Sequence, residues 1–337
     1  MVVLAVLATL LVALAIATRL SEAGLDAQRL ADYTQAREAN YLVARSAFEM
    51  GLEVLRSDTN QTDGPGDNWA VGELDVEWEG RKVALRIVDE ESRFPLGRLQ
   101  KAPDQEKVLA EALVRLVRRA GGPAPEESVD RLLDWVDPDL VRRPSGAELG
   151  DYGRNRVKDA PLDSVAELQT LPGWSTPPAL PAPRRRPPPP LESLKGATPG
   201  GDLELPETGL PTPGPQTPGA PETSDWSDWL TVHSSGKINV NTAAPELLTS
   251  LDPGMTEVTV QEIVNRRQDE AFQGGDDLRQ VPGVDADLLF RLEKLVGYES
   301  RNFEIRAAVG EPPGRVVLRG VVRRGGGPMK VLFWEVQ

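Results

Sequence analysis

The stretch that decides the fold reads VVLAVLATLLVALAIATRLSEAGL and covers residues 2–25. Its first 17 residues are apolar or small, the first charged residue is Arg19 and the first acid is Glu22. No proline interrupts the chain before Pro65, and apolar residues recur at helical spacing through Leu55. We therefore predict one helix of about 55 residues, roughly 80 Å long at 1.5 Å per residue. Its first third needs lipid or other helices around it, and its last third can pack on a sheet.

The apolar run is near the lower limit for a membrane span, because a helix needs about 20 residues to cross about 30 Å of hydrocarbon. A cleavable signal peptide is the alternative, since its apolar core is also short. However, no basic segment precedes the run, and Ala17-Thr18-Arg19 leads into helix-favouring sequence rather than a small-residue cleavage site. We interpret residues 1–19 as the transmembrane part of the N-terminal helix.

The composition argues against most catalytic and nucleic-acid functions. The 337 residues carry a net charge of −14, which repels phosphate backbones. The chain has no cysteine and a single histidine, His233, so thiolate metal sites, His-rich zinc sites and Ser-His-Asp triads lack their parts. We expect no enzyme activity and interpret His233 as a structural residue.

Strand-like alternation occurs in two places that are far apart in the sequence. Two runs lie early and three lie at the C-terminal end, at residues 73–78, 82–88, 303–309, 315–323 and 329–336. Helical patterns lie between them, at residues 104–119, 126–136, 162–171 and 243–296. This order predicts an α+β fold in which the long N-terminal helix packs on an antiparallel sheet, with a large all-α domain inserted between the strands.

The predicted domain boundaries follow from these patterns. Beyond the membrane part, residues 20–102 and 301–337 form the two parts of the helix-and-sheet domain, and residues 103–300 form the inserted domain. Within the insertion, residues 172–223 hold more than half of the chain's 30 prolines. Such a composition cannot build a core, so we expect an extended or disordered loop there.

Carboxylates concentrate around a turn in the inserted domain. Hard oxygen ligands at close spacing suit calcium, which binds six to eight oxygens in flexible geometry. The spacing is not that of an EF-hand loop, which requires acids at alternating positions and a central glycine. Helix capping and ion pairs with Arg142 and Arg143 are the alternative interpretation. The candidate calcium ligands are Asp134, Asp137, Asp139, Glu148 and Asp151.

Residues 237–296 resemble paired helix–hairpin–helix units, whose hairpin amides can bind DNA phosphates at a helix N-terminus. Thr242 can cap the first helix, with Pro245 in its first turn, and the hairpins are Asp252–Met255 and Val281–Val284. Between residues 237 and 294, however, eleven acidic side chains stand against six basic ones, and Asp252 lies at the hairpin itself. We therefore predict a structural module, and a membrane-anchored DNA-uptake receptor remains the alternative.

Taken together, the order of these motifs resembles the K-type minor pseudopilin (GspK) family of the bacterial type II secretion system. The resemblance covers nearly the whole chain apart from the proline-rich loop. Besides the N-terminal helix, its motifs are residues 44–47 (ARSA), 132–139 (LLDWVDPD), 143–148 (RPSGAE), 161–164 (PLDS) with Leu168, 172–174 (PGW) and 237–248 (KINVNTAAPELL).

The resemblance implies a pilin-like fold with an inserted α-helical domain, and a place at the tip of a periplasmic pseudopilus. It also implies neighbours, which are the I- and J-type minor pseudopilins and further the H-type. The N-terminal helix would be anchored in the inner membrane, with the globular part in the periplasm. Calcium binding by the globular region is a property of the family, which adds weight to the acidic turn. A minor pilin of a type IV pilus is the alternative within the same class.

The chain departs from the family's pattern in three ways. Where most members carry Asp-Glu-x-Gly-x-x-Asn-Leu-Asn, residues 89–97 read DEESRFPLG. No short basic leader precedes the apolar helix, which we interpret as a processed chain or a start further upstream. Most pilin-like subunits carry an early glutamate that pairs with the N-terminal amine of an adjacent subunit, and this chain has Ala5 there. Since that contact with a subunit above is lost, we interpret Ala5 as an assembly feature of a terminal cap.

Overall fold

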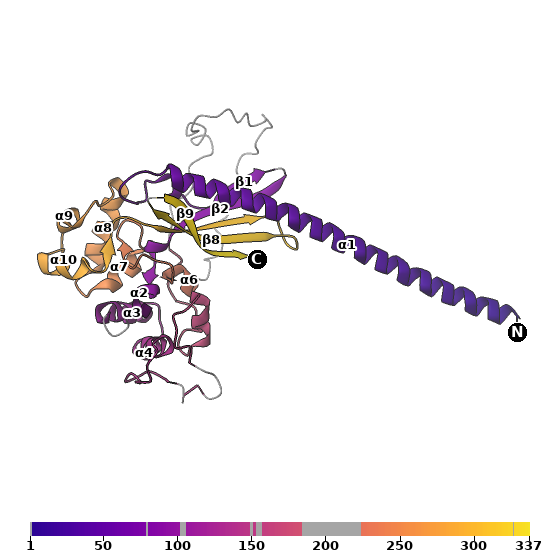
Figure 1. The fold of residues 1–337 in the computed structure, drawn as a ribbon, viewed down its shortest axis with the longest axis horizontal. Coiled ribbons are helices and arrows are strands. Elements are labelled where there is room, and N and C mark those ends of the chain that lie inside the picture. The colour runs from indigo at the N-terminus through magenta and orange to yellow at the C-terminus, as the bar shows by residue number, and fades with distance from the viewer. Residues whose placement is uncertain are drawn as a thin grey trace, which may run out of the picture.

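The structure is a computed structural model that describes residues 2–78, 80–101, 106–148, 151–152, 157–183, 224–325 and 327–337; the side chains of residues 2–6, 8, 9 and 12 are not described. It consists of a long helix, a five-stranded sheet and a mainly helical insertion between two of the sheet's strands. The first helix projects far beyond the rest of the molecule, and the insertion packs at the other end of the sheet (Figure 1).

The N-terminal helix α1 (Val2–Ser57) is continuous. One face of its last third is buried against the sheet through Ala44, Phe48, Leu52 and Leu55. Leu25 and Leu30 are exposed, because the sheet does not reach that part of the helix (Figure 1). In the described part of the chain, no helix is both long and apolar enough to cross a membrane, so the transmembrane prediction for residues 1–19 is not confirmed.

The sheet is antiparallel throughout, and its strands lie in the order β1-β2-β7-β8-β9. Alternate residues of the central strands point toward α1, because successive side chains of a strand face opposite sides of the sheet. The strand that follows the insertion, β7, pairs with β2 over seven residue pairs, from Val83↔Val309 to Asp89↔Phe303. The strands are β1 (Leu74–Trp78), β2 (Arg81–Asp89), β7 (Asn302–Val309), β8 (Val316–Gly325) and β9 (Gly327–Val336).

Helix and sheet approach closely where Phe48 meets strand β8. A Cβ atom on Gly320 would lie 2.6 Å from the Phe48 ring, so only glycine fits there without a shift. The same ring packs edge-on against Trp334 of β9, with the ring centroids 4.8 Å apart. Trp334 is nevertheless 41% exposed, because β9 lies at the edge of the sheet.

In the described residues, the insertion is built from short helices and four two-residue strands. Its regular elements, in chain order, are β3 (Phe94–Pro95), α2 (Leu96–Lys101), α3 (Lys107–Arg119), α4 (Pro125–Val136), the 3₁₀-helix η3 (Val165–Thr170), α6 (Trp226–Trp229), β4 (Leu230–Thr231), β5 (Ile238–Asn239), α7 (Pro245–Leu251), α8 (Glu257–Asp269), α9 (Gly275–Arg279), α10 (Ala286–Leu292) and β6 (Val296–Gly297). The strand pairs β3–β4 and β5–β6 are parallel and bring distant parts of the insertion together.

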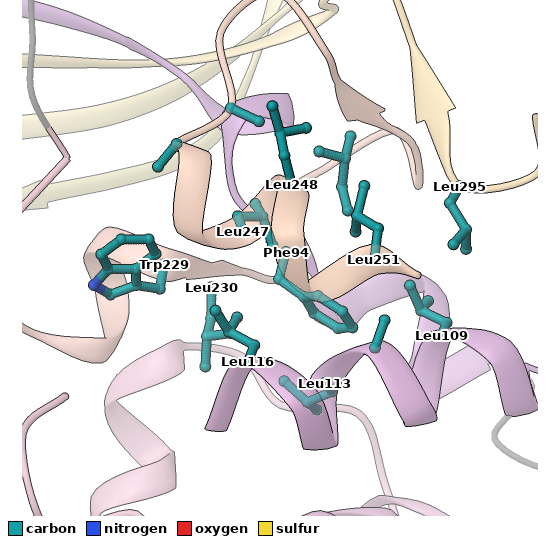
Figure 2. Close-up of a cluster of buried hydrophobic side chains, with 14 of the residues drawn as sticks. Phe94, Leu109, Leu113, Leu116, Trp229, Leu230, Leu247, Leu248, Leu251 and Leu295 are labelled. Atoms are coloured by element: carbon teal, nitrogen blue, oxygen red, sulfur yellow. The ribbon is translucent and has the colours of Figure 1, made fainter. Parts of the chain in front are cut away.

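The insertion has its own hydrophobic core, separate from the one beneath α1. Figure 2 shows the ring of Phe94 between leucines of α3 and leucines of α7. Phe94, Leu113 and Leu251 are each fully buried. Trp174 and Trp226 close another part of this core with an edge-on ring contact at 4.9 Å. The inserted segment therefore packs as a compact unit around side chains contributed from residues 94 to 296.

The α+β architecture predicted from the sequence is confirmed: a long helix on an antiparallel sheet, with an inserted helical domain. One predicted helix is wrong in type, because residues 162–171 form only the 3₁₀-helix η3, which begins at a capping box between Ser164 and Glu167. Most of the predicted proline-rich loop, residues 184–223, lies outside the described residues.

Candidate functional sites

Asp134 of the acidic turn is a buried carboxylate that holds the following loop in place. It lies near the C-terminal end of α4 and is fully buried. Its carboxylate accepts hydrogen bonds from the Arg143 backbone N–H at 3.2 Å and from Arg143 Nη1 at 2.6 Å. A Cβ atom at position 146 would lie 1.8 Å from Asp134 Oδ2, so Gly146 is required for this approach. The Arg-Pro-Ser-Gly run therefore closes a loop on Asp134 and leaves that side chain with internal partners.

Three other acids of the turn lie close together, and the described residues donate too few hydrogen bonds to their carboxylates. Carboxylate oxygens of Asp137, Asp139 and Glu148 lie within 4.8 Å of one another. Both oxygens of Glu148 and Oδ1 of Asp137 are buried with no hydrogen-bond partner among the described residues. Burial raises the pKa of Asp137 and of Glu148, and the negative charges of Asp134 and Asp137 raise the pKa of Glu148 further. Buried oxygens without donors are unfavourable unless something positive reaches them.

Asp151 takes a different position from the one predicted. Its Oδ2 accepts the Glu148 backbone N–H at 2.9 Å, and its Oδ1 faces Arg142 Nη1 at 3.3 Å. The predicted ion pairs with Arg142 and Arg143 are thus present, but they engage Asp151, Asp134 and one oxygen of Asp137. The structure brings together only three of the five predicted ligands. Those three fit calcium, since carboxylates supply part of its six to eight oxygens and water and carbonyl groups the rest.

A second group of acids, which the sequence did not reveal, already has an internal cation. Carboxylate oxygens of Asp58, Asp63 and Asp67 also lie within 4.8 Å of one another. Arg324 of β8 donates to Asp58 Oδ2 at 2.6 Å and to Asp63, and the Ser300 backbone N–H donates to Asp63 Oδ2 at 2.6 Å. Burial still raises the pKa of Asp63 to about 6. The guanidinium occupies the place that a metal ion would take.

The junction between sheet and insertion is a buried polar network. Strand β2 ends at Asp89, and Glu90 and Glu91 follow in the short 3₁₀-helix Glu90–Ser92; all three acids are buried. Asp89 Oδ2 accepts the Ser300 hydroxyl at 2.6 Å and the Thr242 hydroxyl. These contacts join the sheet to the inserted domain, and the departure of residues 89–97 from the family's motif hid them from sequence analysis.

Glu91 and Glu90 extend this junction with different partners. Glu91 accepts backbone N–H groups from Ser235 at 2.8 Å and Asn302 at 3.1 Å. Burial, and then repulsion from Asp89, raises the pKa of Glu91 to about 8. Glu90 instead pairs with buried Arg93 at 2.6 Å. The three consecutive acids after an apolar strand were the only sequence signal of this site.

The helix–hairpin–helix region is held by its own acids and amides. Asp252 Oδ1 accepts the Gly254 backbone N–H at 2.8 Å, and Arg291 pairs with the same carboxylate at 2.8 Å. The hydrogen bond from Arg291 lowers the pKa of Asp252. An internal carboxylate therefore occupies the first hairpin where a phosphate would bind. Asn241 completes the module by exchanging two hydrogen bonds with the Phe272 backbone, at 2.8 and 3.0 Å.

The distal part of α1 carries an uncovered apolar surface. Its large apolar side chains are between 53% and 72% exposed: Leu7, Leu10, Leu11, Leu14, Ile16, Leu20, Leu25 and Leu30. Such a continuous surface is typical of a site for lipid or partner helices. Ala5 lies outside the residues whose side chains are described, so its role stays a prediction.

The fold and this projecting helix define a class of protein, a pilin-like subunit with a helical insertion. A chain from the crystal structure of the GspK-GspI-GspJ complex of the enterotoxigenic Escherichia coli type 2 secretion system has a similar fold. The TM-score is 0.63 and the identity 16%, and the match covers 92% of this chain and 98% of that one.

Sequence comparisons with family models show the same resemblance. Two models described as type II secretion system protein K match residues 92–179 and residues 238–293. No curated protein sequence matches the chain. Both matched segments lie in the inserted domain, on either side of the proline-rich loop. The resemblance to the K-type minor pseudopilin of type II secretion is thereby confirmed.

Proposed function

We propose that this pseudopilin caps or initiates the pseudopilus at its tip and so supports protein export across the outer membrane. The observation that carries the proposal is the shape of the molecule: a bare apolar helix at one end and a bulky insertion at the other (Figure 1). The helix provides a surface for packing into a bundle of neighbouring helices. The family is one of structural pseudopilins, which supports our expectation that the chain is not an enzyme.

The proposed partners are the I- and J-type minor pseudopilins, because the solved complex of similar fold contains those two chains. The H-type minor pseudopilin is a further expected neighbour. Leucines that are more than half exposed on α1 would become buried in such a bundle, and each fully buried leucine contributes about 1.5–3 kcal/mol.

The terminal position is supported by two features. The insertion adds a second hydrophobic core beside the sheet and would obstruct the stacking of another subunit. Ala5 offers no carboxylate to the N-terminal amine of a subunit above it. Before assembly we place the apolar part of α1 in the inner membrane and the globular part in the periplasm, on the basis of the exposed apolar side chains.

The experiment is co-purification of the full chain with its I- and J-type partners after co-expression. The double variant Leu10→Asp/Leu14→Asp introduces two charges on the bare surface and should abolish co-purification. The double variant Thr18→Asp/Ser21→Asp adds the same charges at neighbouring polar positions and should retain it. Equal behaviour of the two variants would contradict packing through this surface.

The tip position needs a separate measurement. Antibody-gold labelling of isolated pseudopili should mark one end of each fibre. Labelling along the shaft would contradict a cap and would leave the co-purification result intact. The Ala5→Glu variant sharpens this test, because a restored carboxylate should shift part of the label into the shaft.

We further propose that Asp137, Asp139 and Glu148 bind calcium. The support is the buried Glu148 carboxylate without donors beside two other acids. A ligand that binds only the folded state stabilises it by about 2.7 kcal/mol at a hundredfold excess over its Kd. Calorimetric titration of the full chain should give one calcium site, which Glu148→Gln abolishes and Asp151→Asn retains. Absence of binding heat and of thermal stabilisation at millimolar calcium would contradict the calcium site.

A further inference from the structure

Three arginines lie directly abreast on neighbouring strands of the sheet. Arg86 of β2 pairs in register with Arg306 of β7, and Arg306 pairs in register with Arg319 of β8. They point away from α1, since the adjacent Ile87, Ile305 and Leu318 belong to the core beneath that helix. Like charges placed directly opposite one another destabilise a sheet. This arginine row, Arg86, Arg306 and Arg319, is therefore unfavourable for the isolated fold.

Among the described residues, acidic side chains of the chain form an ion pair with only one end of the row, at Arg319. Arg319 donates through Nε and Nη2 to Glu304 at 2.9 and 2.7 Å, and Arg93 approaches the same carboxylate at 3.3 Å. Arg86 and Arg306 make no ion pair within the parts of the chain that the structure describes. The Nε of Arg86 is buried without a hydrogen-bond partner. Burial, followed by repulsion from Arg93, lowers the pKa of Arg86.

A cavity of about 330 Å³ adjoins the Arg319 end of the row, between the sheet and the inserted domain. Trp226, Phe333 and His233 give it aromatic walls, and Arg319 lies 5.6 Å over the Phe333 ring. Burial lowers the pKa of His233, so this side chain is neutral at pH 7. Acidic groups also line the cavity, but Glu90 is engaged by Arg93.

Glu335 lies opposite Arg319 in the sheet register, and Glu304, Glu73 and Asp228 lie close enough to attract Arg86. Among the described residues, none of these acids forms an ion pair with Arg86 or Arg306. The chain as a whole carries a charge of −14, so a negatively charged ligand is repelled elsewhere and attracted here. Guanidinium groups bind carboxylates in bidentate geometry, which favours a polypeptide carboxylate as the missing counter-charge.

We propose that the arginine row and the adjoining cavity bind an acidic segment of a partner protein. Its carboxylates pair with Arg86 and Arg306, and one of its larger side chains enters the cavity beside Phe333. The proposal goes beyond the tip function and does not depend on it, because it concerns the sheet face opposite α1. Failure of the co-purification described above would therefore leave it standing.

The probe is a fluorescein-labelled nonapeptide with the sequence Glu-Ser-Glu-Ser-Phe-Ser-Glu-Ser-Glu, measured by fluorescence anisotropy with the full chain in detergent. Arg306→Glu should weaken its binding roughly tenfold or more, because an attraction becomes a repulsion. Arg279→Glu makes the same charge change at an exposed position on α9 and should alter binding at most about twofold. Equal losses in the two variants would overturn the assignment to this face.

Three further measurements test the proposal. Arg86→Leu should weaken peptide binding and raise the thermal midpoint, because it removes the buried unpaired Nε. Parental peptide affinity in Arg86→Leu would overturn the proposal. So would equal binding of the peptide with lysine in place of glutamate. Displacement of the peptide by millimolar inorganic phosphate would reveal a small-anion site and equally overturn a partner segment.

Discussion

The acidic turn and the domain junction both bury carboxylates, but they balance them in different ways. At the junction, Asp89 and Glu91 accept hydroxyl and amide hydrogens, and Arg324 lies between Asp58 and Asp63. At the turn, the Glu148 carboxylate accepts no hydrogen bond and has no cation among the described residues. A buried acid with its own donors joins two parts of a fold, whereas one without donors requires something from outside. The comparison separates acids with internal donors from acids without them, which sequence spacing does not do.

The largest effect should come from breaking the junction. Arg324→Ala leaves Asp58 and Asp63 without their cation, and removing one partner of a buried ion pair costs about 3–5 kcal/mol. Urea denaturation of the full chain measures this loss. The control, Arg301→Ala, removes an exposed pair with Glu299 and should change the free energy of unfolding by less than about 1 kcal/mol. A small loss of unfolding free energy for Arg324→Ala would contradict the distinction between acids with internal partners and acids without them.

The acidic turn should respond in the opposite direction when calcium is absent. Glu148→Gln replaces a buried carboxylate that has no donors, so it should stabilise the calcium-free chain by about 1 kcal/mol. Because burial raises the pKa of Glu148, its contribution is favourable below the unfolded pKa and is lost as pH rises through the folded one. Thermal unfolding in chelator at pH 5 and pH 8 tests both statements. A destabilised Glu148→Gln would contradict the turn as an unbalanced site.

A smaller effect distinguishes Glu91 within the junction. Its pKa is raised to about 8, so stability present at low pH is lost as pH rises through about 8. Where the unfolded chain has lost this proton and the folded chain still holds it, the slope is about 1.4 kcal/mol per pH unit. Glu91→Gln should flatten the stability profile between the unfolded pKa of 4.5 and the folded pKa of about 8, and leave the value below pH 4.5 nearly unchanged. An unaltered slope would contradict the raised pKa of Glu91.

The smallest expected effect concerns DNA. The hairpin carboxylate of Asp252 already binds the Gly254 amide and Arg291, so the full chain should produce no salt-dependent gel shift with duplex DNA. Asp252→Asn lowers the local negative charge and is the variant in which DNA binding would be easiest to detect. A shift that weakens with salt in either protein would restore the DNA-receptor alternative.

Much of the fold was predictable because it rests on local patterns. The spacing of Phe48, Leu52 and Leu55 marks the buried face of α1, and the alternation in residues 82–88 marks a buried strand. Residues 162–171 were misassigned as an α-helix, because a capping box also begins shorter helices. Leu25 and Leu30 could not be assigned from spacing either, since periodicity does not show where the sheet ends.

The candidate site was only half predictable. Of the five predicted ligands, the structure brings together Asp137, Asp139 and Glu148, whereas Asp134 and Asp151 pair with Arg143 and Arg142. Arg143 also pairs with Asp137, and calcium binding stays a prediction. The ion pair between Asp63 and Arg324 spans 261 positions of sequence, and nothing local indicates it. Three consecutive acids at positions 89–91 were a signal that could have been weighed more heavily.

By itself the sequence determined the long helix, the strands, the insertion and the resemblance to a family of pseudopilins, because the periodicity of apolar residues and the order of the motifs can be read along the chain. Tertiary structure alone decided which acids have donors, and it placed the three arginines side by side on separate strands. The physical reason is that the free energy of a charged group depends on what lies within a few ångströms of it in space. Strand β7 meets β2 only after an insertion of more than 200 residues, so the order of the chain does not show which charges become neighbours.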